Sequence, residues 1–392
     1  MRENIQNEGE EKITLENKEE IINTNQYTEK TLTEEEMKSA EELTGLFTSH
    51  LASTYDISPD LKIKQTIPTG IDLFDTILGG GIATGLVQFV GNPGCGKSML
   101  ASKIISTGQR KWPGKFIGVY CDSEVAQTTD RLAQLGVTCP KVKPYSEGLT
   151  VEKIFKIIDG LCVFKEENKL MDIPSVIVWD SIANTATEAG MKTDNINEIL
   201  GLKARILSGM LPKYVQKLMY YNISLVAVNQ LRDKMSIGQM FPTPNELKYL
   251  GDHQIPGGKS VLFNSIQLFF LRPIGDIKGE YGFLGNRVRM KGVKNKLFTP
   301  NIEVSVVFSF EKGFSNFWTN FELLKDTKRI QSGAWVYLKD YSEKKFRQKE
   351  VIEAYRTDEK FRTLFDQNVE DVLKTEFIDM YASTSNSTVE VL

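Results

Sequence analysis

The stretch LVQFVGNPGCGKSMLASKIIST, residues 86–107, decides the fold. It begins with a short apolar run (86–91), continues through a glycine-rich turn and ends in a segment of helical character (97–109). The turn fits the pattern G-x-x-x-x-G-K-[ST] in full, from Gly91 to Ser98. A buried strand, a glycine-rich turn and a helix in this order predict an α/β protein with a phosphate site at the helix N-terminus.

Each part of the turn has a chemical role. Glycines allow consecutive backbone N–H groups to point into one concavity, and the helix N-terminus adds a partial positive charge. We expect Lys97 to reach the β- and γ-phosphates of ATP and the Ser98 hydroxyl to bind Mg²⁺. The predicted nucleotide-binding residues here are Gly91, Asn92, Pro93, Gly94, Cys95, Gly96, Lys97, Ser98 and Met99. The alternative is a glycine-rich turn that binds nothing.

Further apolar runs extend the pattern along the chain. FIGVYC (116–121), VIVWD (176–180) and SLVAVNQ (224–230) are predicted strands, and helical segments such as 151–165 separate them. Continuous apolar strands that alternate with helices predict a parallel sheet covered on both faces. The stretches 260–273, 286–291 and 302–310 predict antiparallel strands that extend this sheet.

Composition narrows the possible functions. The chain has 392 residues, of which 41% are hydrophobic and 25% charged, as in an ordinary globular protein. The net charge is −3, so any affinity for an acidic partner must come from local clusters. Two histidines and four cysteines without C-x-x-C spacing weigh against zinc hydrolases, catalytic triads and disulfide frameworks. Without a signal peptide or a long apolar run, we expect a cytoplasmic protein without membrane association.

Two strand ends carry candidate catalytic carboxylates. Asp180 ends VIVWD, where it is expected to hold Mg²⁺ through a water molecule. The second strand ends in Cys121-Asp122-Ser123-Glu124, and hydrolysis needs a group that orients the attacking water. Glu124 lies far enough beyond the strand to reach a γ-phosphate. Asp122, and a solvated loop carboxylate without a catalytic role, remain open alternatives.

The assembled pattern resembles the RecA family of ATP-dependent recombinases, and within it the phage UvsX-like members. The resemblance runs from IPTGIDLFDTILGGGIATG (67–85) through the phosphate loop to VKNKLFTP (293–300). A looser likeness continues in GFSNFWTNFELL (313–324) and SGAWVYL (332–338). It implies a RecA-like core with a mostly parallel central sheet flanked by helices, and a DNA-dependent ATPase that forms filaments on single-stranded DNA.

The resemblance also assigns roles within the site. Glu124 matches the family's catalytic glutamate, and Gln230 in Asn229-Gln230-Leu231-Arg232 matches a glutamine that senses the γ-phosphate. Lys294 and Lys296 match paired lysines that reach a neighbouring subunit's ATP. A polar strand-end residue is the alternative for Gln230, and a solvated cationic strand face is the alternative for the lysines. Where the family often places an aromatic residue over adenine, this chain has Arg131, which is expected to bind the nucleotide by stacking on the base.

Two segments, 186–199 and 233–258, resemble the family's DNA-binding loops. Both combine backbone amides with a few cations, and the second adds an apolar wedge, which suits a single strand held by its phosphates. The DNA-binding residues that the resemblance implies are Arg205, Ser208, Lys234, Met240, Phe241, Gly257, Gly258 and Lys259.

The expected domain organisation has five parts. They are a flexible acidic tail (1–32), an N-terminal helical segment for oligomerisation (33–66), the ATPase core (67–314), a small C-terminal α/β domain (315–380) and a flexible tail (381–392). The amphipathic helix expected at 34–52 packs on its own core or on a neighbouring subunit, and both remain open.

The expected partners are single- and double-stranded DNA, further copies of the chain in a helical filament, recombination mediators and single-strand-binding proteins. Two rival functions remain open. A ring-forming RecA-type helicase would use the same nucleotide residues, and a RecA-like paralogue would bind nucleotide without strand exchange.

Overall fold

The computed structural model describes residues 65–138, 144–145, 148–193, 195, 201–233, 253–279, 281–342 and 344–379, together with 38–39, 42–44, 46 and 49. The chain divides into two compact units, Met1–Leu61 and Lys62–Leu392, and each is described by itself. In the first unit the described residues are helical, and Leu43 and Leu46 expose 65% and 70% of their surface. The expected tails, 1–32 and 381–392, lie outside the described residues.

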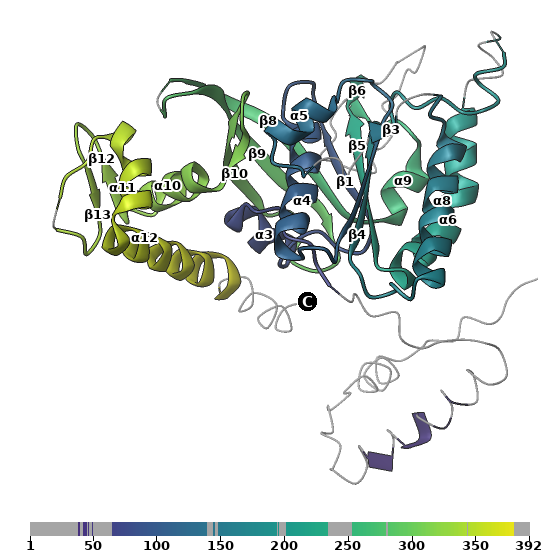
Figure 1. The fold of residues 1–392 in the computed structure, drawn as a ribbon, viewed down its shortest axis with the longest axis horizontal. Helices are drawn as coiled ribbons and strands as arrows, with labels where there is room; N and C mark the ends of the chain where they lie inside the picture. Colours follow the sequence, from purple (N-terminus) through teal and green to yellow (C-terminus); the bar gives the residue numbers. More distant parts are fainter. Residues whose placement is uncertain are drawn as a thin grey trace, which may run out of the picture. The chain divides into compact units, whose positions relative to one another are not determined.

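Within the described part of the second unit, nine strands form one sheet in the order β11-β10-β9-β8-β1-β5-β4-β2-β3 (Figure 1). Five parallel strands make one half: β1 (Gly85–Gly91), β5 (Ile223–Gln230), β4 (Ser175–Asp180), β2 (Ile117–Asp122) and β3 (Pro144–Tyr145). The other half contains β8 (Ser265–Lys278), β9 (Leu284–Asn295), β10 (Glu303–Ser309) and β11 (Gly313–Ser315). The predicted α/β class with a mostly parallel central sheet flanked by helices is confirmed.

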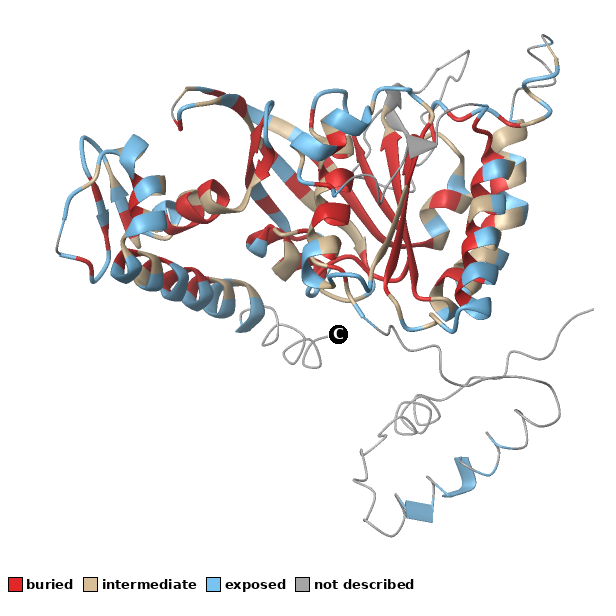
Figure 2. Cartoon of the chain, in the orientation of Figure 1, coloured by how far each residue is buried: buried red, intermediate tan, exposed pale blue. Residues whose placement is uncertain are grey.

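Helices cover both faces of this sheet (Figures 1 and 2). The long helices are α4 (Lys97–Lys111), α6 (Val151–Glu167) and α8 (Leu202–Tyr220), and the short ones are α3 (Asp72–Leu78), α5 (Thr129–Gln134) and α9 (Lys259–Asn264). Successive strand residues face opposite sides, so Val178 packs in the cluster with α3 and α4, and Trp179 in the cluster with α6 and α8. Burial on both faces explains the continuous apolar runs. No helix within the described ranges is long and apolar enough to cross a membrane.

The prediction of an antiparallel strand over 260–273 is wrong in part. Residues up to Asn264 belong to α9, and β8 then pairs in parallel with β1 while it pairs antiparallel with β9. A short apolar run does not distinguish a helical segment from a strand, and strand direction depends on the connection before it. Here α9 is that connection. The side-chain amide of Gln88 on β1 donates to the backbone oxygen of Val261 in α9 and to the hydroxyl of Ser265, the first residue after the helix.

The C-terminal region continues the same core. It contains α10 (Asn316–Asp326), β12 (Ile330–Ser332), β13 (Val336–Leu338), a 3₁₀ turn (Gln348–Glu350), α11 (Val351–Thr357), α12 (Glu359–Val372) and a π-helical turn η2 (Leu373–Asp379). Trp318, Phe321 and Phe365 are buried in one cluster with the residues of β1 and α4. The side chain of Asn316 accepts a hydrogen bond of 2.8 Å from the backbone N–H of Asp72 on α3.

Candidate functional site

A cavity of about 340 Å³ lies at the carboxyl ends of the parallel strands. Parallel strands present these ends on one edge of the sheet, where open α/β sheets bind ligands. The phosphate loop contributes Pro93, Gly94, Gly96, Lys97, Ser98 and Met99. The strands and the turns after them contribute Glu124, Asp180, Val228, Gln230, Phe308 and Phe310. The structure therefore gathers most of the predicted nucleotide-site residues around one space.

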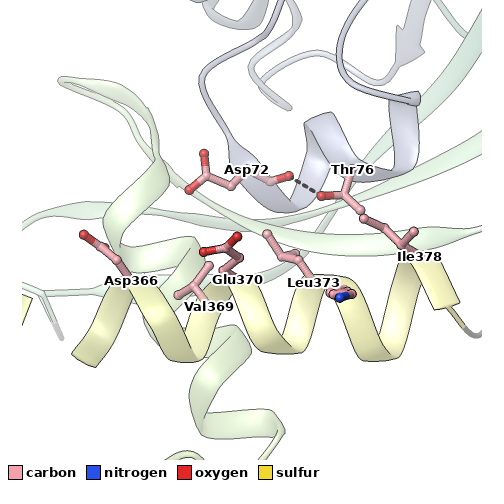
Figure 3. A pocket seen from close by; sticks show the side chains of 8 residues that line it. Asp72, Thr76, Asp366, Val369, Glu370, Leu373 and Ile378 are labelled. Carbon is pink, nitrogen blue, oxygen red and sulfur yellow. Dashed lines mark hydrogen bonds between the residues drawn. The ribbon is translucent and has the colours of Figure 1, made fainter. Parts of the chain in front are cut away.

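A second cavity, of about 500 Å³, lies between α3 and the helices at the end of the chain (Figure 3). Asp72 and Thr76 line it from α3, opposite Val369, Glu370 and Leu373. It is larger than the first cavity, yet it contains none of the phosphate-loop residues. Size alone therefore does not identify the nucleotide site.

The phosphate loop has the backbone that its glycines predict. Gly94 and Gly96 adopt φ of 80° and 86°, in the left-handed region. A Cβ added at Gly96 would lie 2.8 Å from the ring of Phe308 and 2.9 Å from that of Phe314. Only glycine fits this position, because both the backbone angle and the two rings exclude a side chain.

Lys97 places its charge at the centre of the loop. Its Nζ donates to the carbonyl oxygens of Gly91 at 2.9 Å and Asn92 at 2.8 Å, and the side chain is buried. Gly91, Asn92 and Cys95 are not among the described residues that line the cavity. Burial raises the pKa of Cys95, so its thiol stays protonated in this loop.

The predicted metal pair lies together. Asp180 is 3% exposed, and its Oδ2 accepts a hydrogen bond of 2.8 Å from the phenol of Tyr120. The side chain of Ser98 acts on the same carboxylate and, like Tyr120, lowers its pKa. Burial raises the pKa of Asp180 to about 6, and the negative charges of Glu124 and Asp122 act in the same direction. No cluster of three or more His, Cys, Asp or Glu side chains suited to a metal occurs within the described residues. Ser98 and Asp180 thus fit a cation that takes its other oxygen ligands from phosphate and water.

Glu124 lines the cavity and forms the centre of a hydrogen-bond network. Its Oε1 accepts from Ser181 Oγ at 2.7 Å, from Asn184 Nδ2 at 2.7 Å and from Gln230 Nε2 at 3.0 Å. The two residues expected to act on the γ-phosphate, Glu124 and Gln230, are therefore in direct contact.

Asp122 has a different environment. It is fully buried, and its carboxylate accepts from the backbone N–H of Glu124 at 3.0 Å and of Gln127 at 2.7 Å. These bonds fix the turn that carries Glu124. Of the two carboxylates that the sequence offers, Glu124 is the one that faces the cavity.

Arg131 does not line the cavity. Its guanidinium donates to the backbone oxygens of Phe310 at 3.0 Å and Glu311 at 3.1 Å. The aromatic surface at the cavity comes from Phe308 and Phe310, and Phe310 is 51% exposed. The sequence analysis missed both residues. The available signal was a pair of aromatic residues at the end of a predicted strand.

Lys294 and Lys296 are not among the described residues that line this cavity. Lys294 Nζ donates to the backbone oxygens of Leu262 at 3.2 Å and Phe263 at 2.7 Å, near the end of α9. Burial and the charge of Lys296 lower the pKa of Lys294. Lys296 is exposed, so its charge is presented to the surroundings of the subunit.

Several candidate DNA-binding residues gather around α8 and α9. Arg205 and Ser208 are exposed on α8. A Cβ at Gly257 would lie 3.1 Å from the side chain of Leu207, and one at Gly258 would lie 3.0 Å from that of Ala204. Because glycine has no side chain, the backbone at both positions can lie close to α8. Lys259, which is exposed, follows at the start of α9. Lys234, Met240 and Phe241 lie outside the described residues.

Comparisons with known proteins identify the family of this chain. A family model of the RecA N-terminal domain matches residues 55–315. Protein RecA of Colwellia psychrerythraea is 31% identical over 274 residues, which cover 69% of this chain and 73% of the relative. Protein RecA 2 of Myxococcus xanthus is 29% identical over 280 residues, covering 71% of this chain and 72% of the relative. Protein RecA of Brucella anthropi is 30% identical over 281 residues, which cover 71% of this chain and 72% of the relative. The chain therefore belongs to the RecA family.

Proposed function

We propose that this protein is an ATP-dependent DNA recombinase. It binds ATP with Mg²⁺, polymerises on single-stranded DNA and pairs that strand with a homologous duplex. The observation that carries the proposal is the contact between Glu124 and Gln230 at the edge of the phosphate-loop cavity. In a member of the RecA family, this contact links Glu124, a carboxylate suited to hydrolysis, with Gln230, which shortly precedes the candidate DNA-binding segment 233–258.

ATP hydrolysis follows from the residues around the cavity. Lys97 and the loop N–H groups hold the phosphates. Ser98 and Asp180 would hold Mg²⁺, which would offset negative charge on the phosphates when bound. Glu124 accepts a hydrogen bond from the attacking water. The water oxygen bonds to the γ-phosphorus as the bond from that phosphorus to the bridging oxygen breaks. One water proton passes to Glu124 and from there to an oxygen of the departing phosphate, the other stays on the incoming oxygen, and ADP and phosphate leave.

Gln230 connects this chemistry to DNA. It ends β5, directly before the segment 233–258, and its amide contacts Glu124. When ATP is bound, the Gln230 amide can leave the Glu124 carboxylate and donate to a γ-phosphate oxygen instead. Its position then depends on the nucleotide state, so it can act as a switch. Arg205, Ser208 and Lys259 lie on neighbouring helices and supply contacts to the strand phosphates.

In this proposal Lys294 and Lys296 complete the ATP site of the next subunit. Neither is among the described residues that line the cavity of its own subunit, and Lys296 is exposed, which supports this role. A contact of this kind is heterologous and does not close on itself, which produces a helical filament. Hydrolysis then requires assembly.

The relatives named RecA support a recombinase over a ring-forming helicase or a paralogue without strand exchange. The closer likeness to phage UvsX-type proteins, the cytoplasmic location and the partnership with mediator and single-strand-binding proteins belong to the proposal.

The first test is ATP turnover with and without single-stranded DNA over a salt series. We expect strong stimulation that fades as salt rises, because phosphate contacts release counterions. Electron microscopy should then show helical filaments, and a strand-exchange assay should yield joint molecules. Closed rings, or filaments without exchange, would contradict the proposal.

A further inference from the structure

Asn184 contacts the candidate catalytic glutamate from the turn after β4, in which it is exposed between buried neighbours. Its Nδ2 lies 2.7 Å from Oε1 of Glu124, a shorter distance than the 3.0 Å from Gln230. The side chain of Asn184 is exposed, so core packing does not account for it. The sequence patterns that pointed to Glu124 and Gln230 gave no indication of this residue.

The turn that carries Asn184 is fixed from several directions. Thr185 Oγ1 donates to the backbone oxygen of Ser181 at 2.7 Å and accepts from Trp179 Nε1 at 2.7 Å. Lys203, at the start of α8, donates to the backbone oxygens of Ile182 at 2.9 Å and Ala183 at 2.8 Å. The backbone therefore presents the Asn184 amide in a defined place, as a residue that orients another group requires.

The network leaves the two oxygens of Glu124 in different situations. Three donors meet at Oε1, from Ser181, Asn184 and Gln230. Within the described residues, no donor meets Oε2. Three bonds to one oxygen fix the rotation of the carboxylate and leave the other oxygen to accept from a water molecule.

We propose that Asn184 is a positioning residue for ATP hydrolysis, which holds Glu124 so that Oε2 meets the attacking water. The inference rests on the proposed role of Glu124. Gln230 leaves Glu124 when it turns to the γ-phosphate, and Asn184 then remains, with Ser181, to keep the carboxylate in place.

The test uses the full chain with Asn184→Ala and Asn184→Asp, measured at saturating single-stranded DNA. For Asn184→Ala we expect kcat to fall about tenfold with KM for ATP little changed, because orientation is lost while phosphate binding is kept. For Asn184→Asp, a second carboxylate stands beside Glu124, and two such groups share one proton. The acid limb of the kcat–pH profile should then move to higher pH by about one unit or more.

A matched control is Asn168→Asp, which changes another exposed amide, one that donates to the backbone oxygen of Phe164 at 2.8 Å after α6. It should leave the pH profile unchanged.

Wild-type kcat in Asn184→Ala, or an unmoved acid limb in Asn184→Asp, would overturn the proposal. Glu124→Gln, measured in the same assay, separates the catalytic role of Glu124 from the positioning role of Asn184. Normal turnover in Glu124→Gln refutes the catalytic assignment, whereas an inactive Glu124→Gln with an unaffected Asn184→Ala refutes the positioning role alone. If Asn184→Ala fails to fold, the nearly isosteric Asn184→Asp carries the test.

Discussion

The phenol of Tyr120 donates a hydrogen bond of 2.8 Å to Oδ2 of Asp180, and both residues are buried on the neighbouring strands β2 and β4. This bond favours the ionised carboxylate, whereas burial opposes it and raises the pKa of Asp180 to about 6. Tyr120 therefore favours the ionised form of Asp180, the charge state that the proposed Mg²⁺ ligand requires.

Tyr120→Phe should weaken Mg²⁺ binding. Loss of the donor raises the pKa of Asp180 further, so that less of the carboxylate is ionised and the remaining anion is less well held. We expect the Mg²⁺ concentration for half-maximal ATP hydrolysis near pH 6.5 to rise about tenfold, the size of one hydrogen bond to a charged group. A Mg²⁺ titration at saturating ATP measures this. An unchanged midpoint would show that the phenol does not support the metal ligand.

Asp180→Asn should stabilise the protein in the absence of nucleotide and Mg²⁺. The pKa of Asp180 in the folded protein, about 6, lies above the ordinary value of 3.8. The unfolded chain therefore ionises first, and stability falls as pH rises from about 4 to 6. The side chain of Asn carries no charge, so its burial does not lower stability as pH rises. Urea unfolding should therefore show a gain of up to about 3 kcal/mol at pH 7 and almost none at pH 4. An equal gain at both pH values would mean that ionisation is not its source.

Gly96→Ala should destabilise the phosphate loop more than Gly94→Ala. Both glycines have φ near 80°, so both variants carry the same backbone strain. At Gly96 the added methyl also meets Phe308 and Phe314, whereas at Gly94 it meets nothing within 4 Å. We expect a further loss of about 1–3 kcal/mol in Gly96→Ala, measured by urea unfolding. Phe308→Leu combined with Gly96→Ala should recover part of this loss, and equal stability of the two alanine variants would refute the steric explanation.

Lys296→Ala should separate nucleotide binding from DNA-stimulated hydrolysis. The side chain is exposed on the subunit and lies away from its own cavity. Monomeric ATP binding should therefore remain normal while stimulation by single-stranded DNA is lost, most completely when Lys294→Ala is added. Arg289→Ala is the matched control, because Arg289 is an exposed cation on β9 that lies 3.7 Å from Glu303. Retained stimulation in the double variant would remove the role across the subunit interface.

The sequence predicted those parts of the molecule that depend on local pattern. Continuous apolar runs predicted the central strands, and the phosphate loop placed Lys97 and Ser98, because strand, turn and helix follow one another directly. Asp180 was predictable for the same reason, as the last residue of a buried strand.

Contacts between distant segments could not be predicted in this way. The direction of β8 depends on how α9 packs, and Phe308 and Phe310 reach the cavity from more than 200 residues beyond the loop. Asn184 and Tyr120 act through single hydrogen bonds to residues about 60 positions away. No periodicity or spacing encodes such contacts, since they arise only when the strands align at one edge.

The shared core of the sheet and the C-terminal helices limits how the gene can be shortened. A fragment ending at the expected boundary, residue 314, would lose Trp318, Phe321 and Phe365 from the cluster that also holds β1 and α4. It would also lose the Asn316 side chain that binds the start of α3. Such a fragment would expose the apolar side chains of β1 and α4 that this cluster covers, and we expect it to aggregate on expression. The ATPase and the C-terminal region must therefore be dissected by point substitution in the intact chain rather than by deletion.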